Sequence, residues 1–238
     1  MKLTRLLSVV ASVACIGLAA PASATIITAT YHGTVNYGTD YAGVFGGGAG
    51  SSLTGLAFTS IYTFDTTLGT PVSQAGSCGT GCTYDQNINN GGTYFATSSP
   101  SLGASFTING ITFTFDGSFL GHISAYSNSS GERQNLHFVD NGSYSSLLNY
   151  VYGYTSLAAD INATYAWNPS MGGNQYGEVR RYDGAGNELY FANFNNSGGS
   201  LEVTSGTASV PEPATLSLLA LGLLGLGAVR RRDRQAPA

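Results

Sequence analysis

The chain has 238 residues, only 9% of them are charged, and its formal net charge at pH 7 is −4. Residues 25–209 are more acidic still, with eleven Asp and Glu side chains against three arginines and no lysine, which gives a net charge of −8. This balance argues against nucleic acid or anionic lipid as a partner, because both need a basic surface, and it leaves glycine, serine, threonine and asparagine to supply the polar surface.

The first 24 residues predict a secretory signal peptide, which the Sec machinery would export. A charged start, an apolar core and a small-residue cleavage site follow one another: Lys2 and Arg5, residues 6–18, and Ala22-Ser23-Ala24. Removing this segment and the C-terminal stretch considered below leaves residues 25–209. That length is enough for one domain with a substantial core.

Alternating patterns predict strands on both sides of a glycine-rich segment. Apolar and polar residues alternate from Ile27 to Tyr37 and again from Leu56 to Asp65, a period of two that is typical of half-buried strands. Between them, residues 43–52 include three consecutive glycines but no following Gly-Lys-Ser/Thr. This segment therefore predicts a flexible surface loop rather than a phosphate-binding loop.

The clearest local structure is a hairpin at residues 104–115. Asn109-Gly110 is typical of a two-residue type I′ turn. This turn places the apolar residues of both flanking strands on one face, so turn chemistry and hydrophobic pattern predict the same register. A second hairpin is expected to turn at residues 183–187.

The pattern of strands and turns predicts the fold class. Residues 145–157 also alternate, and no convincing helical period occurs in residues 25–209. Many short strands separated by Gly and Asn turns predict an all-β domain, an antiparallel β-sandwich or a jelly-roll-like fold.

Cys78 and Cys82 are the cysteines that remain after export. Their spacing is not the Cys-x-x-Cys of thiol oxidoreductases, and a four-ligand metal site would need partners that the neighbouring residues do not offer. In an oxidising compartment the pair predicts a local disulfide, which would pin a loop rather than hold the fold. No cofactor and no metal site is expected.

His137 is one candidate catalytic residue. Acidic and hydroxyl side chains lie near it in sequence: Glu132, Asp140, Ser143 and Ser145. A nucleophile–base–acid trio is a spatial arrangement, however, and serine is abundant in this chain. A surface or packed histidine is the simpler interpretation.

Glu178 and Glu188 are a second catalytic candidate, because they flank the second predicted hairpin. A glycosidase needs two carboxylates about 5–10 Å apart. Beside Arg180 and Arg181, two acids on a hairpin are more typical of a solvated ion-pair ladder. The loop between them offers oxygen ligands for calcium but lacks the acidic density of an EF-hand loop, so a plain turn is favoured. We therefore expect a protein that is not an enzyme.

A run of aromatic residues suggests a ligand surface. Tyr150, Tyr152 and Tyr154 alternate along one predicted strand, and Trp167 follows at a short distance in sequence. Together they could form an aromatic platform for sugar rings, since aromatic faces supply area and leave a polar handle for hydroxyl groups. The alternative is cross-strand packing within the sheet.

The C-terminal stretch, residues 210–234, combines three features. Val210-Pro211-Glu212-Pro213 opens it, residues 214–229 are apolar or small throughout, and a cluster of arginines closes it: Arg230, Arg231, Arg232 and Arg234. A helix of 16 residues is about 24 Å long, against about 30 Å for a bilayer core. The segment is short for a transmembrane helix but workable with arginines that reach the interface.

This order of features closely resembles the PEP-CTERM protein-sorting signal of Gram-negative bacteria. The resemblance implies a transient inner-membrane anchor and processing by an exosortase, a membrane transpeptidase, near Pro211-Glu212-Pro213. These three residues would be a recognition site for that enzyme. Proteins of this family accompany exopolysaccharide loci and the outer surface or extracellular matrix.

The sequence thus predicts an exported, non-catalytic surface or matrix protein that is associated with exopolysaccharide in a biofilm. The alternative is a carbohydrate-binding module or a carbohydrate-active enzyme that is exported by the same route. A hydrolase should show two facing carboxylates in a cleft, whereas a structural module should not.

Overall fold

The computed structural model describes residues 23–68, 71–73, 84–91, 99–116, 119–128, 132–141, 145–154, 157–158, 160–195 and 198–209. Thr25–Thr207 form one compact unit, which is the subject of this section. Several predicted features lie outside the described residues: residues 1–22 of the signal peptide, Cys78, Cys82, Ser143, Pro211-Glu212-Pro213 and the apolar segment 214–229.

Two antiparallel sheets make up the described unit. The first has six strands in the order β12 (Tyr165–Trp167), β15 (Ser200–Ser209), β1 (Ser23–Thr34), β4 (Ala57–Asp65), β7 (Ser101–Ile108) and β8 (Ile111–Phe115). The second has nine strands in the order β3 (Ser51–Ser52), β2 (Tyr37–Asp40), β14 (Glu188–Asn193), β13 (Asn174–Tyr182), β11 (Ser146–Tyr154), β10 (Glu132–Asp140), β9 (Leu120–Asn128), β6 (Tyr84–Gly91) and β5 (Pro71–Ser73).

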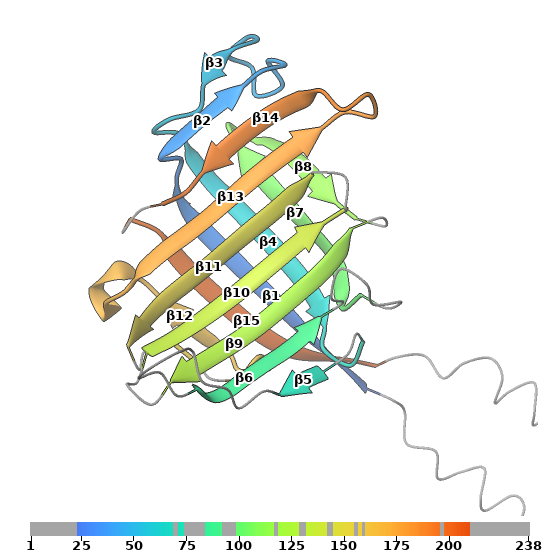
Figure 1. Ribbon diagram of the computed structural model, residues 1–238, viewed down its shortest axis with the longest axis vertical. Coiled ribbons are helices and arrows are strands. Elements are labelled where there is room, and N and C mark those ends of the chain that lie inside the picture. Colours follow the sequence, from blue (N-terminus) through green and yellow to red (C-terminus); the bar gives the residue numbers. More distant parts are fainter. Residues whose placement is uncertain are drawn as a thin grey trace, which may run out of the picture. The chain divides into compact units, whose positions relative to one another are not determined.

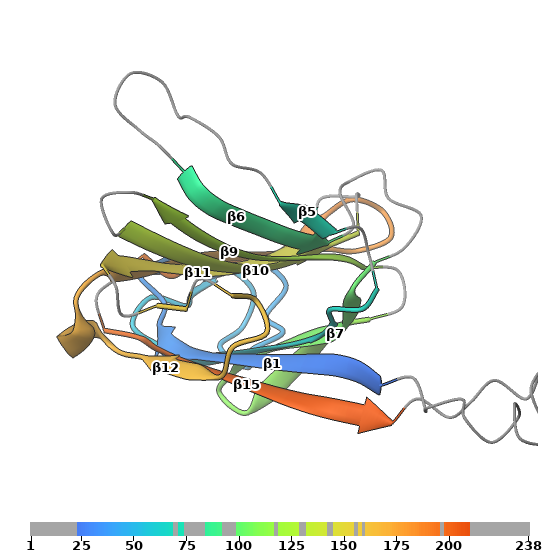
Figure 2. The same ribbon diagram turned by 90° about the horizontal axis from the view of Figure 1, so that it is seen from below.

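The two sheets lie face to face. Figure 1 looks through the nine-stranded sheet onto the six-stranded sheet behind it, and Figure 2 shows the two layers from below, with β9, β10 and β11 in one and β1 and β15 in the other. Apolar side chains of both sheets meet in one core, among them Ile27, Phe64 and Val151. The predicted all-β antiparallel sandwich is confirmed.

Helical structure is minor in the described part of the chain. The helix in these residues is a single 3₁₀ turn, η1 (Pro169–Met171). In the described ranges no helix has the length and apolar character needed to cross a membrane.

The hairpin predicted at residues 104–115 is confirmed as β7 and β8. Its register pairs Ile108 with Ile111 and Ala104 with Phe115. Asn109 and Gly110 have φ angles of 52° and 75°, as a type I′ turn requires. The second predicted hairpin is confirmed as β13 and β14, with an irregularity after Arg181.

The strands predicted around the glycine-rich segment pair as β1 and β4, with Ile27 opposite Phe64. Their predicted inward faces are buried from Ile27 to Tyr31, but Tyr37 breaks the pattern with 59% exposure. The reason is that the chain leaves the six-stranded sheet after Thr34 and enters the other sheet as β2. Alternation of apolar and polar residues therefore predicts the buried face only while the chain stays in one sheet.

The glycine-rich loop at residues 43–52 carries one residue into the core. The buried carboxylate of Asp40 accepts hydrogen bonds from the backbone N–H groups of Val44 (2.9 Å) and Phe45 (2.7 Å). Phe45 is only 2% exposed and packs its ring against those of Phe106 and Tyr190. This loop, expected to lie on the surface, therefore also closes the space between the sheets.

Replacing Gly110 with valine is expected to lower the free energy of unfolding by roughly 1 kcal/mol or more, because a β-branched residue adopts a positive φ only with strain. Thermal unfolding of the purified protein measures this. Thr114→Val is the matched control, since Thr114 is exposed in β8 of the same hairpin and is already β-branched. Equal melting temperatures for Gly110→Val and the wild type would contradict the turn assignment.

Candidate functional site

The outward face of the nine-stranded sheet carries a group of stacked tyrosines. Along β11, Leu147, Asn149 and Val151 are buried in the core, so the alternating Tyr150 and Tyr152 face outward and are partly exposed. Strand alternation fixes this placement. Tyr150 and Tyr152 therefore lie on the solvent side of the sheet and not between the sheets.

Tyr176 completes this group from the neighbouring strand β13, where it lies directly opposite Tyr150. Its ring centroid is 5.2 Å from that of Tyr150 and 5.6 Å from that of Tyr152, with interplanar angles of 16° and 18°. We call Tyr150, Tyr152 and Tyr176 the tyrosine stack. Cross-strand packing, the alternative weighed for this strand, does occur, but on the solvent side of the sheet.

Polar contacts hold the stack in place, and the surroundings of Tyr150 and Tyr176 favour the protonated form of their hydroxyl groups. The side-chain amide of Asn174 donates to the Tyr152 hydroxyl at 2.9 Å. A hydrogen bond with Tyr152 raises the pKa of Tyr176, and burial raises the pKa of Tyr150. All these shifts favour the neutral phenol, which can donate and accept hydrogen bonds at neutral pH.

Apolar side chains border the tyrosine stack on the same outward face. On β10, Leu136 lies opposite Tyr150, and Phe138 lies opposite Leu148 of β11. The outward face of the six-stranded sheet differs, because hydroxyl residues dominate it: Thr28, Thr30, Thr59, Thr63, Ser105, Thr107, Thr112 and Thr114. The aromatic character is thus confined to one of the two outer faces.

Two other residues of the predicted platform do not join the stack. Tyr154 lies at the end of β11, where its backbone pairs with Glu132, and its side chain is outside what the structure describes. Trp167 lies on β12 of the other sheet, is 1% exposed, and donates its indole N–H to the carbonyl of Gly172 at 2.9 Å. The grouping of Trp167 with the tyrosines is therefore corrected, because its ring belongs to the core.

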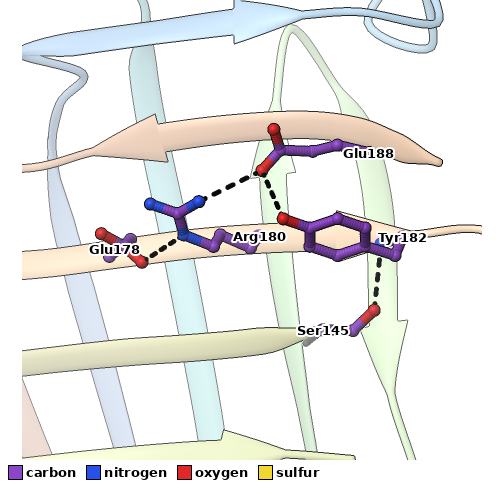
Figure 3. Close-up of polar contacts among 5 residues, drawn as sticks. All are labelled: Ser145, Glu178, Arg180, Tyr182 and Glu188. Carbon is purple, nitrogen blue, oxygen red and sulfur yellow. Dashed lines mark hydrogen bonds and ion pairs between the residues drawn. The ribbon is translucent and has the colours of Figure 1, made fainter. Parts of the chain in front are cut away.

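Glu178 and Glu188 bind the same guanidinium group (Figure 3). Arg180 Nε lies 2.6 Å from Glu178 Oε1, and Arg180 Nη1 lies 3.4 Å from Glu188 Oε1. The Glu178 hydrogen bond raises the pKa of Arg180. Glu188 also accepts a hydrogen bond from the Tyr182 hydroxyl at 3.2 Å. This arrangement is the partly exposed ion-pair ladder weighed above, and both carboxylates already have a partner.

His137 lies in the core rather than beside Ser145. Its Nδ1 is 2.7 Å from the Tyr31 hydroxyl, and its ring packs against that of Tyr62. Burial lowers the pKa of His137 to about 3. Ser145 Oγ instead accepts a hydrogen bond from the backbone N–H of Tyr182 at 3.0 Å (Figure 3). The described residues of the proposed trio are therefore not brought together as a nucleophile and base.

The loop at residues 183–187 uses its own carboxylate to form a turn. Asp183 Oδ1 accepts from the backbone N–H groups of Ala185 (2.8 Å) and Asn187 (2.9 Å), and Oδ2 accepts from the Asn187 side chain. The Asn187 side chain is the main cause of the lowered pKa of Asp183. Among the residues with described positions, no three His, Cys, Asp or Glu side chains gather in a way that would hold a metal ion.

A shallow hollow of about 420 Å³ opens over the six-stranded sheet, on the opposite side from the tyrosine stack. His32 and Thr59 line it, with Nδ1 and Oγ1 3.0 Å apart, as does Asn109 of the hairpin turn. Its lining includes no carboxylate, so it offers hydrogen-bonding groups without an acid–base pair.

The comparisons with known proteins concern the end of the chain. A family model for the PEP-CTERM protein-sorting motif matches residues 209–232. The chain carries a PEP-CTERM sorting motif. No curated protein and no solved structure matches the chain.

The PEP-CTERM motif confirms the predicted class of sorting signal and supports an exported protein that is sorted by an exosortase. The match begins at Ser209, the last residue of β15. In sequence the match therefore begins at the end of the final strand of the sandwich, with no linker between the two.

Sequence reasoning missed Tyr176 as a member of the stack. Asn174, Tyr176, Glu178 and Arg180 alternate with buried residues along β13, so their common outward face could have been recognised. Their position beside Tyr150 and Tyr152 depends on the pairing of β11 with β13, which are separated by β12 and η1 in the chain.

The buried His137 is expected to make stability depend on pH. The unfolded chain binds a proton at His137 below about pH 6.5, whereas the folded protein does so only near pH 3. Above pH 6.5, protonation of His137 therefore takes nothing from the free energy of unfolding. As the pH falls from 6.5 toward 3, the free energy of unfolding decreases, by on the order of 3 kcal/mol at pH 4.

Urea unfolding of the wild type and His137→Gln at pH 7.5 and pH 4 tests this. The variant should lose less stability than the wild type over this interval. His32→Gln is the control, because His32 is exposed, and it should behave like the wild type. Parallel losses in all three proteins would contradict the assignment.

Proposed function

We propose that this PEP-CTERM protein is a non-catalytic component of the cell surface or extracellular matrix, and that it binds exopolysaccharide through the tyrosine stack. The observation that carries the proposal is the outward position of Tyr150, Tyr152 and Tyr176 on a sheet whose inner face already has a complete aromatic core. Packing of the core does not require these three rings.

The chemistry of the stack suits a sugar ligand. Aromatic rings supply contact area at a low cost in side-chain entropy, and phenol hydroxyls supply hydrogen bonds to sugar hydroxyls. The three rings support one another, and Asn174 fixes Tyr152. A ligand would therefore meet a preorganised surface on rigid strands, which lowers the ordering cost of binding.

The carbohydrate-active enzyme considered as the alternative finds less support. A retaining or inverting glycosidase needs one carboxyl group that donates a proton and a second that attacks or activates water. Glu178 and Glu188 are instead both paired with the same Arg180. Binding without hydrolysis is the simpler use of this face.

The route to the surface follows from the PEP-CTERM motif and is part of the proposal. Sec export would leave the chain anchored in the inner membrane through residues 214–229, with the arginines after them in the cytoplasm. An exosortase would then process the chain near Pro211-Glu212-Pro213. The sandwich would finally reside at the outer surface or in the matrix.

Tyr176→Ala is expected to weaken binding of the producing cell's own purified exopolysaccharide roughly tenfold, because it removes the ring that contacts both other tyrosines. Affinity electrophoresis of the full-length protein in detergent measures this, and the same mixtures should release no reducing ends. Tyr37→Ala is the matched control: Tyr37 is an exposed tyrosine of the same sheet, outside the stack. Equal affinities of the Tyr176→Ala and Tyr37→Ala proteins would contradict the role of the stack.

Deleting residues 210–238 is expected to release the sandwich from the membrane fraction into the periplasm. The physical reason is loss of the apolar segment and its flanking arginines. Cell fractionation followed by immunoblotting measures the distribution. Replacing Pro211, Glu212 and Pro213 with alanines is the companion variant, which should remain membrane-bound and unprocessed. Continued membrane retention of the deletion variant would contradict the anchor.

A further inference from the structure

We infer that the polysaccharide held by the tyrosine stack is uncharged, a neutral glycan rather than a polymer of uronic acids or of sulfated or phosphorylated sugars. The inference rests on the proposed function, because it names the ligand class of the same surface. Its basis is the state of every strongly basic side chain in residues 25–209, which are Arg133, Arg180 and Arg181.

Arg180 is the arginine on the outward face, and it is already engaged. It lies four residues beyond Tyr176 on β13, a distance of about 13 Å along the strand. Glu178 and Glu188 both bind its guanidinium group, and its Cζ atom lies 4.4 Å from the ring centroid of Phe191. A ligand carboxylate or sulfate would have to displace a protein carboxylate in order to pair with it.

Arg181 and Arg133 are turned away from the outward face. Arg181 shares the inward parity of Val179, and its Cζ atom lies 5.3 Å from the ring centroids of both Phe115 and Phe119. Arg133 donates from Nη1 to the backbone carbonyl of Leu157 at 2.5 Å. Neither guanidinium group is placed to meet a polymer lying on the tyrosine stack.

Histidine does not supply the missing positive charge at neutral pH. His122 lies on the outward face of β9, opposite Phe138, and burial lowers its pKa, so the ring is neutral at pH 7. His137 is in the core, and His32 lies on the six-stranded sheet.

The charge of the module adds a cost for acidic ligands. A net charge of −8 on residues 25–209 repels a polyanion, most strongly at low ionic strength. Glu178, two residues from Tyr176 on β13, is paired with Arg180. The uncharged groups beside the stack are the tyrosine hydroxyls, the Asn174 amide, and the amide of Gln134, which lies opposite Tyr152 on β10. These groups match sugar hydroxyls.

A bridging cation is the remaining way to hold an acidic polymer on an acidic protein. Within the described part of the chain no group of three acidic, histidine or cysteine side chains gathers to hold a metal ion, and the Asp183 carboxylate is used by its own turn. We therefore expect binding that does not depend on calcium.

Pairs of polymers that share one backbone test the inference: dextran with dextran sulfate, and hydroxyethylcellulose with carboxymethylcellulose. The cell's own exopolysaccharide is added before and after chemical reduction of its carboxyl groups. Affinity electrophoresis of the full-length protein is run at low and high salt, and with calcium or a chelator. Wherever the protein binds a pair of polymers, it should bind the neutral member more tightly than the acidic one. The difference should shrink at high salt, because salt screens the repulsion.

A charge-release variant sharpens the test. Glu178→Gln removes the nearer partner of Arg180 and should improve binding to the acidic polymers by roughly threefold or more at low salt, while binding to neutral polymers stays the same. Glu202→Gln is the matched control, because it removes the same charge from an exposed site on β15 of the other sheet. It should leave both affinities near those of the wild type.

The outcomes separate the two proposals. Equal or tighter binding to acidic polymers, or binding that requires calcium, would overturn the neutral ligand class. The proposed function would still stand if Tyr176→Ala weakened that binding and Tyr37→Ala did not. A wild-type protein that binds no polymer, including the cell's own exopolysaccharide in either form, would overturn the proposed function and the inference with it.

Discussion

Aromatic rings packed between the two sheets are the constraint on which the rest of the sandwich depends. The largest fully buried side chains are mostly aromatic: Trp167, Tyr31, Tyr62, Tyr190, Phe64, Phe106, Phe115 and Phe194. Rings of this size also need space on the neighbouring strand, and Gly33 of β1, which lies opposite Phe58 of β4, shows how it is provided. A Cβ atom at Gly33 would lie 2.8 Å from the ring of Phe58, too close for any other residue without a shift.

The aromatic core also brings polar groups into the interior. Tyr31 and His137 meet there, and burial leaves His137 neutral. A neutral histidine is a good partner for a tyrosine hydroxyl, and a charged one would be costly at this depth. The same packing that holds the sheets together therefore removes His137 from any surface chemistry.

Scarcity of charge explains the difference between the two outer faces. On the six-stranded sheet, threonine and serine provide both strand propensity and hydration without ionic groups. On the nine-stranded sheet, the tyrosine stack and its apolar neighbours replace much of that polar surface.

Local features were predictable from the sequence, and sheet membership was not. The register of the β7–β8 hairpin follows from Asn109-Gly110 and the alternation beside it, because both act within a dozen residues. The Arg180 ion pairs likewise follow from a predicted hairpin. By contrast, the exposure of Tyr37, the burial of Trp167 and the place of Tyr176 depend on which sheet each strand enters. The sheet that a strand joins is determined by contacts between residues that lie far apart in the chain.

The order of strands in the six-stranded sheet has a consequence for biogenesis. β15, the last strand of the sandwich, lies beside β1, the first. During export from the N-terminus, β1 emerges early and can pair with β4 along one edge, but its other edge has no strand of its own sheet to pair with until Ser200–Ser209 has also crossed. An open edge of this kind is prone to pair with other chains. Completion of the sheet thus waits for the residues that directly precede the sorting motif, and export must deliver nearly the whole chain before the sandwich can close.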